Sequence, residues 1–250
     1  MWISLWKKTL HPIIKKIFFY RDYLKDFAGE ALDFLKDIIV IFVIVLVVRT
    51  YFIMPFQING QSMADSYYNR EFIIVDRFSY RDVPFFGKTQ EIERGDVVVF
   101  APGVSDERKY FIKRIIGLPW ETVTIEDGKV YITAPWEQER RELSEIQYLS
   151  DENLGDTTVR WDRTSKNYLV PENRYFVLGD NRNHSTDSRT CFQSCSVRTN
   201  YIMPSEILWK VLLDLWYFNF STFSFEHPDL DISTKPQFFS WLSEVSYPNE

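Results

Sequence analysis

The chain has 250 residues, 45% of them hydrophobic, which is ample for a buried core in one domain or two modest ones. Its formal net charge is -6, and no long basic run occurs outside the N-terminal region, so we do not expect nucleic acid as a partner. Aromatic residues make up 17% of the chain, which suits either contact with a lipid boundary or a large ordinary core.

Residues 1–36 form a basic segment in which apolar side chains recur at helical spacing. Most lysines of the segment, such as Lys7, Lys8 and Lys15, fall on the other side of that helix. A helix of this kind could lie flat on a membrane surface. An ordinary packed or partly ordered helix is the alternative, because Pro12 lies near the middle of the pattern.

Residues 37–54 are predicted to form a transmembrane helix. Residues 38–48 are wholly apolar, and apolar residues resume after Arg49 and Thr50 until Pro55 ends the pattern. At about 1.5 Å per residue the run covers roughly 25 Å, which requires snorkelling flanks or a thinned bilayer. A buried core helix and a cleaved secretory leader are the alternatives. The leader is disfavoured because the run starts deep in the chain and no small-x-small pattern follows it.

The distribution of basic residues predicts the orientation of this helix. Seven lysines and arginines that precede the run set the cytoplasmic side: Lys7, Lys8, Lys15, Lys16, Arg21, Lys25 and Lys36. After Arg49 the next basic residue is Arg70. We therefore expect a single-pass protein with a cytoplasmic N-terminus and the remainder of the chain outside.

Residues 55–226 are predicted to form a mainly β, antiparallel domain, because short runs rich in Val, Ile and Phe follow one another without alternating long helices. The expected strands are residues 71–78, 95–101, 110–117, 122–125, 129–133 and 175–178. The Glu126-Asp127-Gly128 turn indicates a hairpin.

Three further segments of the chain interrupt or follow these strands. Residues 135–167 are strongly charged and are predicted to be a solvated insertion, with a helix over 137–149. Residues 207–225 are apolar but carry Lys210 and Asp214, which favours an edge strand or an interfacial segment over a second span. Residues 227–250 are assigned as a C-terminal tail of unknown role.

Cys191 and Cys195 are the only cysteines. Because the expected topology places both in an oxidising compartment, a tight disulfide is the leading interpretation. A zinc site with His184 is the alternative, but it lacks a clear fourth ligand, and two reduced thiols are a third interpretation. We expect no metal and no cofactor.

Three blocks of the sequence carry candidate chemistry. Ser62 lies in Asn59-Gly60-Gln61-Ser62-Met63, and Lys113 lies in the run from Phe111 to Pro119. The third block runs from Gly179 to Arg189. In their order and spacing the three blocks resemble the type I signal peptidase family, membrane-bound Ser/Lys proteases that cut leader peptides, and the resemblance covers about residues 38–225.

The resemblance implies that Ser62 is the nucleophile, Lys113 the general base, and Ser185 a hydroxyl that orients the lysine ammonium. A lysine acts as a base only when neutral, which requires burial or a nearby cation. Without that context, a lone lysine in a strand is usually a snorkelling surface side chain. The family's charged frame matches four residues, expected to pair with one another or with Arg114: Asp180, Arg182, Asp187 and Arg189.

The resemblance also implies two shallow apolar pockets, which would select small residues one and three positions before the cut. Phe56 and Ile58 align with pocket residues, with Ile112 and Met63 beside them, although all four could be plain core residues. The chain departs from the family at Ala64-Asp65-Ser66, where x-Pro-Thr is usual, and at Gly60, where some members carry an oxyanion-hole serine. The backbone N–H of Ser62 would then do more of that work.

These features together predict a membrane-anchored Ser/Lys endopeptidase that removes signal peptides from secreted preproteins. Its site would face outward from a bacterial cytoplasmic membrane, so preproteins and the lipid bilayer are the expected partners. A self-cleaving, repressor-type Ser/Lys protease is one alternative, disfavoured by the span and by the lack of a DNA-binding helix pair. A catalytically inactive, membrane-tethered β-domain that only binds partners is the other, and it rests on the unusual Ala64-Asp65 turn.

Overall fold

A computed structural model describes residues 11–77, 80, 82–83, 87–88, 90–103, 109–159, 165–196, 198–215, 217–219, 222 and 224–225. The predicted tail at 227–250 and residues 1–10 of the basic segment lie outside these ranges. The boundary between the two compact units of the chain lies between Thr50 and Tyr51. Each unit is therefore described by itself.

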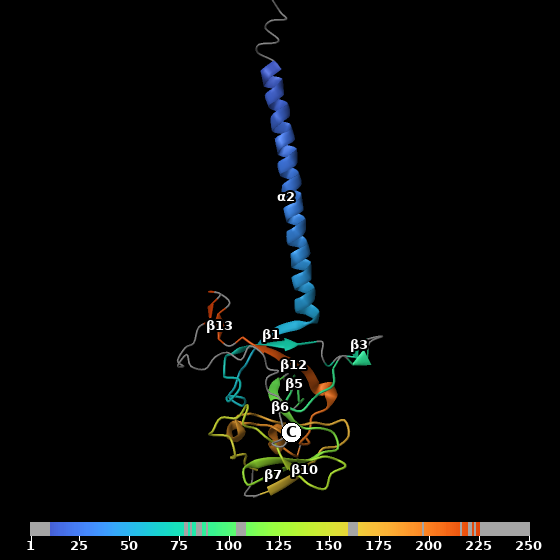
Figure 1. The fold of residues 1–250 in the computed structure, drawn as a ribbon, viewed down its shortest axis with the longest axis vertical. Helices are drawn as coiled ribbons and strands as arrows, with labels where there is room; N and C mark the ends of the chain where they lie inside the picture. The colour runs from blue at the N-terminus through green and yellow to red at the C-terminus, as the bar shows by residue number, and fades with distance from the viewer. Residues whose placement is uncertain are drawn as a thin grey trace, which may run out of the picture. The chain divides into compact units, whose positions relative to one another are not determined.

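The first unit is the helix α2, which runs without a break over His11–Tyr51 (Figure 1). Proline near the start of a helix is tolerated, since the first backbone N–H groups have no partner within the helix, so Pro12 does not interrupt it. Side chains of the apolar run at 38–48 expose between 37% and 63% of their surface. Among the residues described above, no helix combines enough length with enough apolar character to cross a bilayer.

The helix ends earlier than the apolar pattern suggested. Ile53 and Met54, assigned above to the span, begin strand β1 and pair with Asp76 and Val75 of strand β2. Apolar content alone does not distinguish a helix end from the start of a strand, and this short run carried no stop signal before Pro55. Pro55 itself lies within β1, where it is tolerated because β1 is an edge strand.

The second unit is mainly antiparallel β-sheet, which confirms the mainly β, antiparallel part of the predicted fold class. Its larger sheet has the order β1 (Ile53–Gln57), β2 (Phe72–Asp76), β12 (Ile207–Asp214), β5 (Val97–Phe100), β6 (Phe111–Gly117) and β11 (Phe176–Leu178). The second sheet has the order β10 (Ser165–Leu169), β7 (Thr122–Glu126), β8 (Lys129–Thr133) and β9 (Arg141–Glu142). Two short ribbons pair β3 (Asp82–Val83) with β4 (Gly87–Lys88), and β13 (Phe218–Asn219) with β14 (Ser224–Phe225). The described residues also include the 3-10 helices η2 (Arg182–His184), η3 (Ser188–Gln193) and η4 (Pro204–Glu206).

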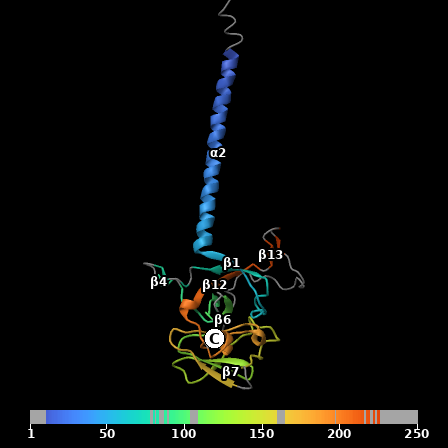
Figure 2. The same cartoon turned by 180° about the vertical axis from the view of Figure 1, so that it is seen from behind.

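The two larger sheets lie at opposite ends of the β unit in both views (Figures 1 and 2). One apolar cluster, containing Ile116, Val123 and Phe176, joins β6, β7 and β11. Gly117 lies at this junction, where an added Cβ would come within 2.5 Å of a Val123 methyl carbon and 3.0 Å of Phe176 Cβ. Only glycine therefore lets the end of β6 approach the neighbouring sheet this closely.

The prediction of an edge strand over residues 207–225 is wrong, because β12 lies inside the larger sheet, between β2 and β5. The charges that suggested an edge are accommodated in the sheet. Lys210 Nζ lies 2.6 Å from a carboxylate oxygen of Asp96, and Asp214 is buried. A charged residue is compatible with an interior strand when a partner lies within reach, and the sequence alone does not show that partner.

The charged insertion at 135–167 also differs from its prediction. No helix forms over 137–149; β9 pairs with β8, and turns follow it. Leu143 packs into the core cluster of the second sheet, and Glu145 is buried. Glu145 accepts a hydrogen bond of 2.8 Å from Arg182 Nη1, so this segment is partly a structural support. Because the segment is so highly charged, its sequence did not show that residues such as Leu143 and Glu145 face inward.

The buried Glu145–Arg182 pair generates a stability prediction. Glu145→Ala leaves the Arg182 guanidinium buried without its countercharge, which should lower the free energy of unfolding by about 3 to 5 kcal/mol. The matched control is Glu137→Ala, which removes the exposed ion pair with Arg141 and should cost less than about 1 kcal/mol. Urea unfolding of the full chain, followed by tryptophan fluorescence, measures both. Equal losses in the two variants would contradict a supporting role for Glu145.

Candidate active site

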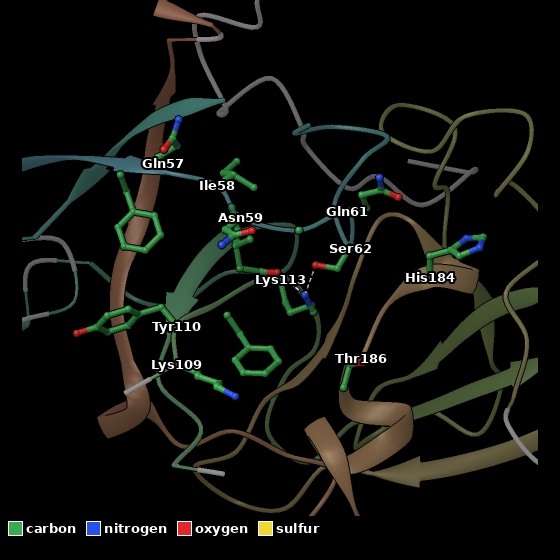
Figure 3. A pocket seen from close by; sticks show the side chains of 14 residues that line it. Gln57, Ile58, Asn59, Gln61, Ser62, Lys109, Tyr110, Lys113, His184 and Thr186 are labelled. Atoms are coloured by element: carbon green, nitrogen blue, oxygen red, sulfur yellow. Dashed lines mark hydrogen bonds between the residues drawn. The ribbon is translucent and has the colours of Figure 1, made fainter. Parts of the chain in front are cut away.

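A cleft of about 540 Å³ opens between the end of β1, the segment that follows it, and β6 (Figure 3). Its lining includes Ser62, Lys113 and the apolar side chains of Phe56, Ile58 and Ile112. Lys109 and Tyr110 line one end of the cleft, and His184 lies on the far side of Ser62. The structure thus brings two of the three candidate catalytic residues and three of the four candidate pocket residues to one cavity.

Ser62 lies on a tight turn that follows β1. Gly60 precedes it at φ 127°, a backbone conformation that glycine adopts far more readily than other residues. After Ser62 the chain turns back at once, because the N–H groups of Ser66 and Tyr67 donate to the Met63 carbonyl at 2.9 and 2.6 Å. These constraints hold Ser62 at the wall of the cleft.

Lys113 lies in the middle of β6, opposite Val98 of β5. Its side chain is only 2% exposed, so it is not the snorkelling surface lysine that the strand context alone favours. Its Nζ donates to Ser62 Oγ at 2.5 Å and to the Ile112 carbonyl at 2.7 Å (Figure 3). A nucleophile and a candidate base are therefore in direct contact.

Burial lowers the pKa of Lys113 from 10.5 to about 8. The carboxylates of Asp187 and Asp180 act in the opposite direction, and the Arg189 guanidinium adds to the lowering. The lowering of the Lys113 pKa by burial exceeds the raising by the two carboxylates. Each carboxylate is already paired with an arginine, which weakens its attraction for the lysine charge. A substantial fraction of Lys113 is consequently neutral near pH 8, as a general base requires.

The charged frame consists of three buried pairs. Arg114 binds Asp180 through two hydrogen bonds of 3.0 and 2.6 Å, and this pair is essentially without solvent exposure. Arg189 binds Asp187 in the same bidentate manner, at 2.9 and 2.8 Å. The third member of the frame, Arg182, takes its carboxylate from Glu145 of the insertion, a partner that the family motif does not contain.

Asp187 links its pair to the site through the backbone. Burial raises the pKa of Asp187, but the Arg189 charge and hydrogen bonds from Arg189 and the Gly179 N–H bring it below its ordinary value. Asp187 therefore stays ionised. It also orders η3, because it accepts from the Arg189 N–H at 3.1 Å at the N-terminus of that helix.

Ser185 is buried beside the dyad but does not donate to or accept from Lys113. Its Oγ has no hydrogen-bond partner within 3.5 Å among the described residues, although it lies close enough to Asp187 to help lower the pKa of that carboxyl. A Cβ added at Gly179 would lie 2.1 Å from Ser185 Oγ and 2.4 Å from the Ser62 carbonyl oxygen. Glycine at 179 thus lets Ser185 approach the nucleophile turn.

Of the candidate pocket residues, Met63 does not line the cleft. It is 1% exposed and packs in the core with Ile58 and Val75, where its sulfur accepts from the Asp180 N–H at 3.4 Å. Phe56 stacks edge to face on Tyr110, with ring centroids 5.9 Å apart, and so contributes to the cleft wall. Met63 lies on the turn that follows Ser62, and there its side chain packs into the core instead of the cleft.

Cys191 and Cys195 form a disulfide with Cα atoms 5.0 Å apart, which leaves no thiolate for the zinc alternative. Cys191 and Phe192 both adopt left-handed backbone conformations, at φ 52° and 62°. The bridge closes the loop in which Phe192 packs on Phe100 and Phe111, at 5.4 and 6.3 Å between ring centroids. Phe111 lines the cleft, so the loop supports the cleft wall.

Two residues beside the site, Asp65 and Ser66, had no role assigned to them from the sequence. Asp65 accepts from the Ser150 N–H and from Asn153 Nδ2, at 2.9 and 3.0 Å, and so ties the nucleophile turn to the insertion. Ser66 Oγ donates to Asp180 at 2.6 Å. The Ala64-Asp65-Ser66 departure from the family pattern therefore has structural partners of its own. The departure itself was a signal, but its partners lie about 85 residues away in sequence.

Comparisons with known proteins point to one family. Residues 31–208 match the family described as "Signal peptidase, peptidase S26". The chain is 31% identical to Signal peptidase I P of Bacillus subtilis subsp. natto, over 64% of this chain and 80% of that protein. It is 32% identical to Signal peptidase I S of Bacillus subtilis strain 168, over 64% and 79%. A solved signal peptidase I from Enterococcus faecalis V583 aligns over 49% of this chain and 97% of its own, at 26% identity and a TM-score of 0.33.

The lowered pKa of Lys113 generates a prediction for the reactivity of Ser62. A neutral amine is required to accept the Ser62 proton, so covalent labelling by a serine-directed sulfonyl fluoride should accelerate as pH rises and level off above about 8. Lys113→Arg should abolish labelling, because a guanidinium does not deprotonate in this range. Mass spectrometry of the labelled peptide measures the rate, with Ser62→Ala as the control. A rate independent of pH between 6 and 9 would contradict Lys113 as the base.

Proposed function

The chain belongs to the signal peptidase, peptidase S26 family, and from that premise we propose that it is a membrane-bound serine endopeptidase that removes signal peptides from secreted preproteins with a Ser62/Lys113 dyad. The observation that carries the proposal is the 2.5 Å contact between Lys113 Nζ and Ser62 Oγ at the cleft wall, made by a lysine that is almost fully buried. A structural lysine would gain nothing from desolvation, whereas a base needs it.

In the proposed mechanism, neutral Lys113 takes the proton of Ser62 as the Oγ attacks the carbonyl carbon that precedes the cut. The tetrahedral intermediate carries its negative charge on the former carbonyl oxygen, which the Ser62 N–H stabilises. The Lys113 ammonium then donates its proton to the leaving amine, and an acyl ester on Ser62 remains. Water, activated by the same lysine, hydrolyses that ester and regenerates the enzyme.

The substrate is proposed to be a preprotein with small residues one and three positions before the cut. Phe56, Ile58 and Ile112 give the cleft apolar walls close to Ser62, where a small side chain fits better than a large or charged one. The cleft is open enough to take an extended peptide, which could lie along the edge strand β1.

Attachment to a bilayer is proposed to occur through the part of α2 that begins at residue 37 and ends at Tyr51. The apolar run at 38–48 leaves every side chain substantially exposed, which is unfavourable in water and favourable in lipid. The cluster of basic residues ahead of the run supports a cytoplasmic N-terminus of a bacterial cytoplasmic membrane protein. The β unit would then act at the outer face, where secreted preproteins emerge.

A cleavage assay tests the proposed activity. The full chain in detergent should cut a preprotein with Ala at both small-residue positions, and replacing the residue before the cut by Trp should abolish cutting. Ser62→Ala and Lys113→Arg should each reduce the rate by at least about a thousandfold, because nucleophile and base act as a unit. N-terminal sequencing of the mature product identifies the cut.

The other outcomes of that assay separate the alternatives. Cleavage of the enzyme's own chain without cleavage of the preprotein would favour the self-cleaving protease. Tight binding of the preprotein without any cut would favour the binding module. Full activity in purified, folded Lys113→Arg would contradict the dyad.

Membrane topology is tested separately. A protease added outside spheroplasts should digest the β unit after Pro55 and leave the N-terminal region intact, because the proposed orientation exposes only the former. Permeabilised spheroplasts serve as the control, in which both regions should become accessible. Protection of the β unit in intact spheroplasts would contradict the proposed orientation, and release of the full chain by high salt would contradict insertion.

A further inference from the structure

Asn181 donates hydrogen bonds to two consecutive backbone carbonyls of the nucleophile turn. Its side-chain Nδ2 donates to the Gln61 carbonyl at 3.0 Å, and its backbone N–H donates to the Ser62 carbonyl at 3.2 Å. Asn181 follows the Gly179-Asp180 pair, in which Gly179 packs on the Ser62 carbonyl and Asp180 is held by Arg114. The amide is thus carried on a rigid support.

The first of these contacts bears on the geometry of the oxyanion hole. The Gln61 carbonyl and the Ser62 N–H belong to one peptide group, and no cis peptide bond occurs in the described residues. In a trans peptide the C=O and N–H bonds point in opposite directions, so a donor that fixes the direction of the C=O bond also fixes the direction of the N–H bond. Holding the Gln61 carbonyl toward Asn181 therefore sets the direction of the Ser62 N–H.

The Ser62 N–H itself is left available. Among the described residues it has no hydrogen-bond acceptor, as expected of a donor reserved for a substrate oxygen. Gly60 supplies no side-chain hydroxyl, so a second donor from that position is absent. The direction of the Ser62 N–H consequently matters more for stabilising the oxyanion here than it would in a site with two donors.

His184 fixes which way the Asn181 amide points. Its Nδ1 lies 3.2 Å from Asn181 Oδ1, and its backbone N–H donates to the Asn181 carbonyl at 3.2 Å. When the imidazole carries its proton on Nδ1, that nitrogen donates to the amide oxygen and leaves the amide NH₂ directed at Gln61. His184 lines the cleft beside Ser62 (Figure 3).

We propose that Asn181 is a positioning residue for catalysis, whose side-chain amide, oriented by His184, holds the Gln61–Ser62 peptide so that the Ser62 N–H points at the oxyanion. The inference rests on the proposed peptidase activity. It adds a residue that acts on the transition state through the backbone and does not touch the substrate.

Asn181→Ala tests the proposal, because it removes the side-chain bond to Gln61 and keeps the backbone bond to Ser62. Cleavage kinetics of the full chain should show kcat reduced about tenfold to a hundredfold with KM changed less than about twofold, since the oxyanion forms only in the transition state. Affinity for a peptide aldehyde, which forms a tetrahedral adduct with Ser62, should fall by the same factor as kcat/KM. Affinity for the uncleaved signal peptide should not change.

Asn183→Ala is the matched control. Asn183 lies in the 3-10 helix η2, of which Asn181 is the N-cap, but its side chain bonds Thr158 and Asp156 at 3.0 and 2.9 Å and does not reach Gln61. It should leave kcat and aldehyde affinity unchanged, and thermal unfolding of both variants separates misfolding from misalignment. Unchanged kcat in Asn181→Ala, or a loss confined to KM, overturns the inference while the wild-type activity stands. A wild-type chain that cuts no preprotein overturns the inference together with the proposed function.

Discussion

An amine can stay buried and partly neutral near pH 8 only if the carboxylates around it are already neutralised by other groups. Lys113 meets this condition because Asp180 is paired with Arg114 and Asp187 with Arg189. Were either arginine absent, its carboxylate would attract the lysine charge and raise the lysine pKa. The ion pairs of the charged frame therefore allow the pKa of Lys113 to stay low, and this electrostatic effect is their first contribution to the site.

The same ion pairs also set the geometry. The Asp180 carboxylate accepts a hydrogen bond from Ser66 Oγ of the nucleophile turn. Asn181, the next residue in the chain, donates hydrogen bonds to the carbonyls of Gln61 and Ser62. The turn is thus held both by its Ser66 side chain and by its backbone carbonyls. Buried ion pairs are weak evidence of net stability, since desolvation offsets much of their attraction. Their value here lies in holding two loops in a single arrangement.

The insertion at 135–167 belongs to this arrangement. Glu145 neutralises Arg182, and Asp65 caps the turn that contains Ser150. The turn that follows the nucleophile is thus bonded to this segment through Asp65. Hydrogen bonds to a neighbouring loop restrain the backbone of that turn, as a proline would do by limiting φ.

The sequence by itself determined the β-rich fold class, the apolar run near the N-terminus and the positions of Ser62 and Lys113, because these depend on local pattern and on the order of short motifs. It also favoured a disulfide between Cys191 and Cys195, because they are the only cysteines and the expected topology places both in an oxidising compartment. It placed β12 at an edge and a helix in the insertion, because it does not show that Lys210 pairs with Asp96 or that Glu145 pairs with Arg182. Only the tertiary structure decided the burial of Lys113, the exclusion of Met63 from the cleft and the hydrogen bonds from Asn181 to the nucleophile turn. Each of these depends on contacts between residues far apart in the chain, and pairing at that distance is a property of the packed fold.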